Sequence, residues 1–166
     1  MTSMKRYFRG VRFVTVLGAA ILVAACAQNP TDQAGAGAGA SATPGSAQDF
    51  VVNVGDRVFF ETDSTELTMQ SRTTLDKQAQ WLTLYNRYAF TVEGHADERG
   101  TREYNIALGA RRAQTVREYL IARGVEASRM RTISYGKERP VAVCNDISCW
   151  SQNRRSVTVL NAGAQG

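Results

Sequence analysis

The chain has very few of the side chains from which metal sites and catalytic centres are built: one histidine and three cysteines in 166 residues. His95 has no second histidine and no cysteine near it in the sequence, so no cluster with metal-ligand spacing surrounds it. Neither Ser134 nor Ser151 lies in a nucleophile motif, and the sequence has no glycine-rich phosphate loop. We therefore expect a protein that is not an enzyme and holds no cofactor or metal, with His95 as a buried, hydrogen-bonded side chain.

Also missing is an apolar run long enough to cross a membrane comfortably. The uncharged stretch Phe13–Ala25 has 13 residues and follows four basic ones, which suits the apolar core of a secretion signal. Its end, Leu22–Cys26, resembles the lipobox of bacterial lipoproteins, in which the cysteine is lipidated; an ordinary cleavage site beside a cysteine is the alternative. The resemblance implies a signal peptide over residues 1–25 and lipidation of Cys26. With Ala27 following, it also implies anchoring in the outer membrane, with the domain in the periplasm.

The excess of positive charge belongs largely to this leading segment. The whole chain has 20 lysine and arginine residues against 15 acidic ones, and four of the basic residues lie in residues 1–25. Sixteen basic residues remain after cleavage, so the mature chain is close to neutral, and it has no basic tract interleaved with aromatic residues. Nucleic-acid binding therefore has little support.

Residues 27–48 are rich in glycine, alanine, serine and proline and contain no large apolar side chain. Such a segment cannot form a packed core, so we expect residues 26–49 to be the lipidated cysteine and a flexible tether. About 110 residues follow, enough for one domain with one core. We place this domain at residues 50–161, with a short tail at residues 162–166.

The apolar pattern of the domain alternates between the periods of strands and helices. Thr68 is expected to cap a first helix that carries Leu75 and Leu82 inward, and Gly124 to end a second, longer helix. The first strand region is expected as two short segments, Phe50–Val52 and Arg57–Phe60, on either side of a turn at Gly55 and Asp56. The later strands are expected at Tyr88–Gly94, Arg131–Tyr135 and Arg155–Leu160. The order β-α-β-α-β-(short helix)-β predicts an α+β two-layer sandwich, with the helices packed on one face of a mixed sheet.

The other two cysteines, Cys144 and Cys149, lie close together in one segment. Because a secreted chain reaches an oxidising compartment, we expect a disulfide between them, which contributes about 2 kcal/mol through chain entropy. A metal pair is the alternative, but the only histidine lies in a different segment.

The most informative stretch is GHADERGTREYNIALGARRAQTVREYL, residues 94–120. It resembles the OmpA-like peptidoglycan-binding domain, whose common pattern is GHTD-x-x-G, then YN-x-x-L, then RA-x-x-V-x-x-YL. Within that family, EGHADERGTREYNIALG and the later RTISYGKERP resemble the branch of peptidoglycan-associated lipoproteins. The resemblance spans roughly residues 51–160 and implies the OmpA-like version of the fold just described.

In this stretch, Asp97 comes just after a strand, and Arg112 lies about three turns into the following helix. A helix that packs back on its own strand brings the two side chains to opposite sides of one cleft. Such a cleft suits a ligand that carries an ammonium and a carboxylate together. The resemblance implies that this ligand is the diaminopimelate of the peptidoglycan stem peptide. Each residue also has an alternative role. Asp97 binds backbone amides of its own loop, and Arg112 forms an ion pair inside the domain, most simply with Asp97. In the second case the ligand would compete with that ion pair.

Four further residues match family positions around the ligand: Asp63 in the segment FETDS, and Tyr104, Asn105 and Leu108 in YN-x-x-L. The family segment reads FDFDS, so Glu61 and Thr62 depart from it on one wall of the cleft. Asn105 is expected to fix the loop of residues 96–101, and Leu108 to close either the pocket or the core beneath it. The segment NRR, residues 153–155, also resembles the family. Two roles are open for its arginines: one of them lies near the ligand, or both cover the edge of the sheet.

Together these features predict a non-enzymatic outer-membrane lipoprotein that binds peptidoglycan and links the outer membrane to the cell wall. The resemblance further implies a place in the Tol system, in envelope integrity and cell division, with TolB and TolA as partners. Two other functions stay open. One is a peptidoglycan-binding lipoprotein outside the Tol system. The other is a peptidoglycan hydrolase, for which the sequence shows no acid–base pair, zinc site or activated nucleophile.

Overall fold

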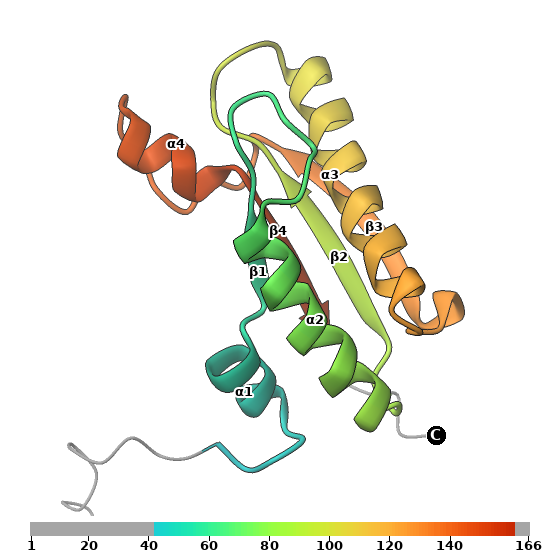
Figure 1. Cartoon of the computed structure of the whole chain (residues 1–166). Helices are drawn as coiled ribbons and strands as arrows, with labels where there is room; N and C mark the ends of the chain where they lie inside the picture. Colours follow the sequence, from blue (N-terminus) through green and yellow to red (C-terminus); the bar gives the residue numbers. More distant parts are fainter. Residues whose placement is uncertain (1–41, 162–166) are drawn as a thin grey trace, which may run out of the picture. The chain divides into compact units, whose positions relative to one another are not determined.

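A computed structural model describes residues 42–161 (Figure 1). Its elements are α1 (Ala47–Asp49), the π-helical turn η1 (Phe50–Val54), β1 (Arg57–Phe59), α2 (Met69–Leu84), β2 (Phe90–His95), α3 (Arg102–Ala122), the 3-10 turn η2 (Ala127–Arg129), β3 (Met130–Gly136), α4 (Ile147–Asn153) and β4 (Arg155–Leu160). The predicted signal peptide (1–25), the lipidation of Cys26, most of the tether and the tail (162–166) lie outside the described residues. Among residues 42–161, no helix has both the length and the apolar character needed to cross a membrane.

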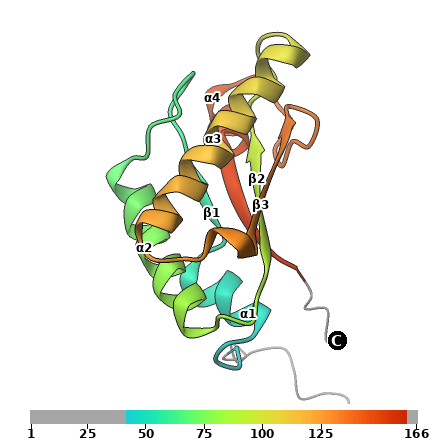
Figure 2. The same cartoon turned by 90° about the vertical axis from the view of Figure 1, so that its right-hand side faces the viewer.

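The four strands form one mixed sheet in the order β1-β4-β2-β3. β2 and β3, which α3 connects, are parallel, whereas β4 is antiparallel to both β1 and β2. The long helices α2 and α3 lie on the same side of this sheet (Figure 2). The predicted α+β two-layer sandwich is therefore confirmed.

The core lies between the sheet and these two helices. Phe90 and Val92 of β2 point into it and are fully buried, as the alternation along the strand predicts. α2 begins after Thr68, as expected, because the Thr68 hydroxyl accepts a hydrogen bond from the backbone N–H of Ser71. From this start the helix buries Leu75 among other apolar side chains of the core.

β2 and α3 approach each other most closely at Gly94 and Gly109. A Cβ on Gly94 would overlap the carbonyl oxygen of Gly109, and a Cβ on Gly109 would lie 2.8 Å from the carbonyl oxygen of Gly94. The two backbones can touch in this way only because neither residue has a side chain. The contact holds the first half of α3 against the end of β2, next to the loop that contains Asp97.

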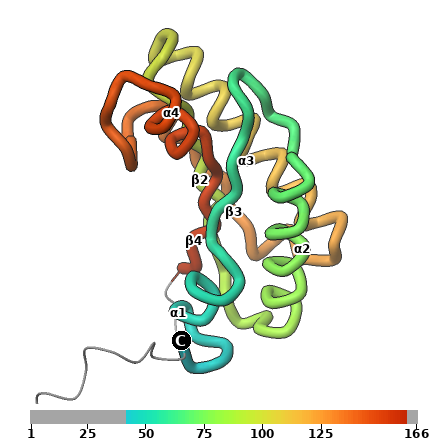
Figure 3. The backbone as a smooth tube through the Cα atoms, turned by 60° about the vertical axis from the view of Figure 1, so that its left-hand side comes forward, coloured from blue at the N-terminus to red at the C-terminus, as the bar shows by residue number. Residues whose placement is uncertain are grey.

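The strand expected at Phe50–Val52 is wrong, because this segment continues α1 as the helical turn η1. A short apolar run fits a strand or a helix equally well, and here Phe50 packs in the core with its ring centroid 4.9 Å from that of Trp81. The residues just before it also contact the domain: Asp49 accepts hydrogen bonds from Trp81 Nε1 and from the backbone N–H of Gly45, both at 2.8 Å. This segment lies at the end of the domain opposite the loops that follow β1 and β2 (Figure 3).

Candidate functional site

All six residues predicted to bind the ligand line one cleft of about 230 Å3 beside the carboxyl end of β2. The cleft is bordered by the turn after β1, by the loop between β2 and α3, and by the first half of α3. Its lining residues are Thr62, Asp63, Asp97, Arg99, Gly100, Tyr104, Asn105, Leu108, Arg112 and Arg154. Arg99 is the charged member of this group that no motif in the sequence indicated.

Arg112 forms the floor of the cleft, and its side chain is fully buried. The guanidinium donates to three backbone carbonyls: Nε to Ser64 at 2.9 Å, Nη1 to His95 at 2.9 Å and Nη2 to Glu61 at 3.1 Å. One side chain thus joins the turn after β1 to the end of β2. Burial, together with the charge of Arg154, lowers the pKa of Arg112 to about 10, so the guanidinium keeps its charge at neutral pH.

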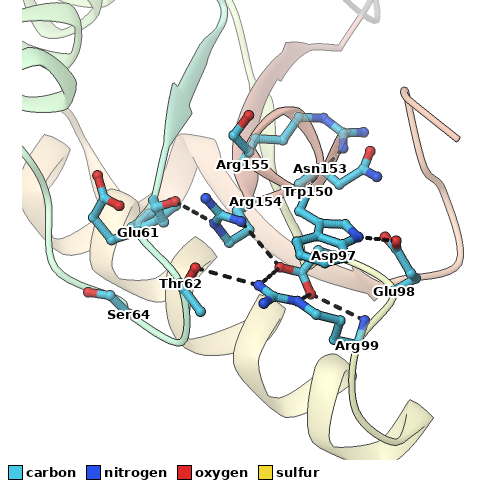
Figure 4. A network of polar contacts seen from close by, with 12 residues as sticks. Glu61, Thr62, Ser64, Asp97, Glu98, Arg99, Trp150, Asn153, Arg154 and Arg155 are labelled. Atoms are coloured by element: carbon cyan, nitrogen blue, oxygen red, sulfur yellow. Dashed lines mark hydrogen bonds and ion pairs between the residues drawn. The ribbon is translucent and has the colours of Figure 1, made fainter. Parts of the chain in front are cut away.

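Asp97 does not pair with Arg112, in contrast to the simplest alternative from the sequence. It pairs instead with Arg99, whose Nη2 lies 2.6 Å from Oδ2 and whose Nε and backbone N–H both donate to Oδ1 (Figure 4). Arg154 adds a longer contact, with Nη1 3.4 Å from Oδ2. Burial raises the pKa of Asp97, but the hydrogen bonds from Arg99 and Arg154 outweigh it and keep the pKa below its usual value.

The most exposed charges of the cleft belong to Arg99 and Asp63. The Arg99 side chain is 41% exposed, and its Nη1 has no hydrogen-bond partner within residues 42–161. Asp63 is exposed in a left-handed backbone conformation, with φ of 52°, and accepts a hydrogen bond from the Tyr104 hydroxyl. A small ligand with a positive and a negative group would therefore meet both a carboxylate and a guanidinium here.

The remaining predicted residues support or complete this cleft. Asn105 is buried and donates from Nδ2 to the carbonyl of Arg99 at 2.7 Å, which confirms that it fixes the loop of residues 96–101. Leu108 is buried and lines the cleft from α3. Of the two arginines in the NRR segment, Arg154 lies in the cleft and donates from Nε to the carbonyl of Phe60, whereas Arg155 is not part of the lining.

His95 is buried, as expected, but both ring nitrogens lack a hydrogen-bond partner in the described part of the chain. Its ring centroid lies 5.6 Å from that of Tyr135, and Nε2 lies 3.6 Å from the carboxylate of Glu93. Burial, and after it the positive charges of Arg155 and Arg139, lowers the pKa of His95 to about 4. The prediction for His95 is thus correct about burial and wrong about hydrogen bonding.

This lowered pKa makes the stability depend on pH. The unfolded chain takes up a proton on His95 near pH 6.5, whereas the folded chain resists protonation down to about pH 4. The free energy of unfolding is therefore expected to fall as the pH drops through this window, by about 3 kcal/mol in total. Urea unfolding at several pH values should show a much weaker dependence in His95→Gln, which has no histidine at all. Equal slopes for the two proteins would contradict this assignment.

Cys144 and Cys149 form the expected disulfide between α4 and the loop before it. No group of three or more His, Cys, Asp or Glu side chains in residues 42–161 is placed to hold a metal ion. Within the described residues, the cleft offers a ligand charged groups, hydrogen-bonding groups and one apolar wall.

The chain matches the OmpA family over residues 59–154. It is 67% identical over 144 residues to the peptidoglycan-associated lipoprotein of Rhizobium meliloti (strain 1021). The aligned region covers 84% of this chain and 82% of that protein. The crystal structure of the peptidoglycan-associated lipoprotein from Burkholderia pseudomallei aligns with a TM-score of 0.62 and 40% identity, over 64% of this chain and 90% of that chain. The C-terminal domain of Helicobacter pylori MotB aligns with a TM-score of 0.61 over 66% of this chain and 86% of that chain, at 23% identity, which shows the shared fold alone.

Proposed function

Since the chain belongs to the OmpA family and, within it, to the peptidoglycan-associated lipoproteins, we propose that it is a non-enzymatic protein that binds peptidoglycan. Through a lipid on Cys26 it would tie the outer membrane to the cell wall. The observation that carries this proposal is the small cleft in which an ionised Asp97, an exposed Asp63 and an exposed Arg99 lie together. A polar, charged ligand fits this lining better than an apolar one.

The proposed ligand is the diaminopimelate of the stem peptide, whose free end carries an ammonium and a carboxylate. The carboxylates of Asp97 and Asp63 would bind the ammonium. Nη1 of Arg99, which has no hydrogen-bond partner within residues 42–161, would bind the carboxylate. Arg112, expected from the sequence to meet the carboxylate, uses three of its five N–H groups on backbone carbonyls. Its part is then to add positive charge from the floor of the cleft and to hold the surrounding loops.

The other three residues have supporting parts in this proposal. Tyr104 orients Asp63 through the hydrogen bond from its hydroxyl. Asn105 fixes the loop that carries Arg99, and Leu108 would contact the aliphatic chain of the ligand. None of these contacts includes a nucleophile or an activated water, so isolated peptidoglycan incubated with the full-length protein should stay undigested.

Asp97→Asn is expected to weaken binding to isolated peptidoglycan by about 10-fold or more, because an amide cannot replace a charge-assisted bond to an ammonium. The measurement is cosedimentation of the full-length protein, in detergent, with peptidoglycan sacculi. Glu103→Gln is the matched control: it removes the same charge from an exposed position in the first turn of α3 and should change binding less than about two-fold. Equal losses in the two variants would show that net charge, and not the cleft, governs binding.

We further propose, from the family resemblance, that TolB and TolA are partners and that the protein acts in envelope integrity and cell division. Under this proposal the protein acts in the Tol system as well as on the cell wall. Recovery of TolB with the purified full-length protein would support the assignment. A protein that cosediments with sacculi but does not retain TolB would instead be a peptidoglycan-binding lipoprotein outside that system.

A further inference from the structure

α4 and the loop before it stand beside the cleft and are fixed to each other at two points. The first is the disulfide from the exposed Cys144 to Cys149, which lies in the first turn of α4 and is 8% exposed. The second is Asn153, whose Oδ1 accepts hydrogen bonds from the backbone N–H groups of Val141 and Ala142 at 2.9 and 3.2 Å. The disulfide therefore acts on the start of α4, and Asn153 on its end.

The residue after Cys149 reaches back to the cleft. Trp150 stacks on Arg99, whose guanidinium carbon lies 4.3 Å from the centroid of the indole ring. Its Nε1–H donates to the carboxylate of Glu98, the residue between Asp97 and Arg99 (Figure 4). The guanidinium of Arg99 is thus held between the carboxylate of Asp97 and the ring of Trp150.

Arg99 is the residue of the cleft for which such support matters most. Arg112 and Arg154 are buried and held by backbone carbonyls, whereas the Arg99 side chain is 41% exposed. A long exposed side chain loses conformational freedom when it binds a ligand, and a contact that fixes it beforehand reduces that loss. Trp150 provides this contact from an element that the disulfide ties down.

We propose that Trp150 and the Cys144–Cys149 disulfide are positioning elements of the cleft. They hold Arg99 so that its Nη1 points to the place where the ligand carboxylate binds. The proposal rests on the proposed function for the identity of the ligand, but the positioning of Arg99 is a property of the free protein. It therefore has one test without ligand and one with ligand.

The ligand-free test uses NMR of the full-length protein in detergent. Protons above an indole ring resonate upfield, so the Nε–H of Arg99 should be shifted upfield in the wild type. In Cys144→Ser/Cys149→Ser and in Trp150→Leu, this signal should move toward the position of a free arginine. Trp150→Phe keeps a ring over Arg99 and should retain most of the shift. An unchanged Arg99 signal in a folded double-serine variant would overturn the proposal.

The ligand test compares two stem peptides, one with the free side-chain carboxylate of diaminopimelate and one in which that carboxylate is an amide. The wild type should prefer the free acid. The double-serine variant should bind the acid about 3- to 10-fold more weakly, the range expected from fixing one arginine side chain beforehand, and should bind the amide as before. In an Arg99→Ala background, removal of the disulfide should have no further effect on either affinity.

These outcomes separate the two proposals. If the Arg99 signal shifts as described but the wild type binds neither peptide, the ligand assignment fails and the positioning of Arg99 stands. If the wild type binds the acid and the double-serine variant loses affinity for both peptides equally, the disulfide acts through general stability, and the positioning role is refuted. Reduction of the wild-type disulfide with a dithiol, which becomes oxidised as the two cysteine thiols form, should reproduce the double-serine result.

Discussion

Gly94→Ala is expected to destabilise the domain by about 4 kcal/mol or more, a large share of the roughly 5–15 kcal/mol by which a typical domain is stable. A Cβ at this position would overlap the carbonyl oxygen of Gly109 and lie 2.6 Å from its carbonyl carbon. These are backbone atoms in the middle of α3, so they cannot turn aside as a flexible side chain would. Relief would require α3 to move away from β2, which would open the core and separate the two halves of the cleft.

Urea unfolding of the full-length protein in detergent measures this effect. The matched control is Gly124→Ala, at the end of α3: a Cβ there meets nothing within 4 Å, and only the left-handed φ of 91° is unfavourable. The control should lose about 1 kcal/mol. If Gly94→Ala were no less stable than Gly124→Ala, the close contact of β2 with α3 would not exist in the protein.

Arg112→Met is expected to cost about 3–5 kcal/mol of stability, although methionine fills much of the same volume. The substitution leaves the carbonyls of Ser64, His95 and Glu61 without the guanidinium that now binds all three. The turn after β1 would then lose this link to β2. Binding of peptidoglycan should weaken as well, because this turn carries Asp63.

The neighbouring Arg111 provides the control, because it is exposed on the same helix. Arg111→Met should change the free energy of unfolding by no more than about 0.5 kcal/mol. The two variants remove the same charge from adjacent positions, so the difference between them isolates the buried hydrogen bonds. Similar stabilities for both variants would mean that Arg112 is not the link between the two loops.

The features that follow from local chemistry could be predicted from the sequence. The cap at Thr68, the inward face of β2 and the strand Arg155–Leu160 were all expected where the structure has them. In each case a periodic apolar pattern or a capping residue determines the outcome. The segment Phe50–Val52 lacks such a signal, because it is too short for a period; it forms a helical turn whose Phe50 packs against Trp81.

The six residues singled out in the sequence all line the cleft, but neither Arg99 nor the pairing of the charges was predicted. Spacing along the strand and helix placed Asp97 and Arg112 near each other, but it could not show which guanidinium binds the carboxylate. Arg99 follows Asp97 by two residues in a loop. At this separation the two side chains can reach each other, so the spacing itself indicated the ion pair that forms. The carbonyls that bind Arg112 come from distant loops, so only the folded chain shows why this arginine is buried.

The central claim is that the cleft recognises the two opposite charges at the end of one ligand. It is tested most directly by calorimetric titration of the full-length protein with two stem peptides, one containing diaminopimelate and the other lysine. Lysine has the same ammonium but lacks the carboxylate that we assign to Arg99. We predict that the diaminopimelate peptide binds at least about 10-fold more tightly. Equal affinity for the two peptides would contradict the claim.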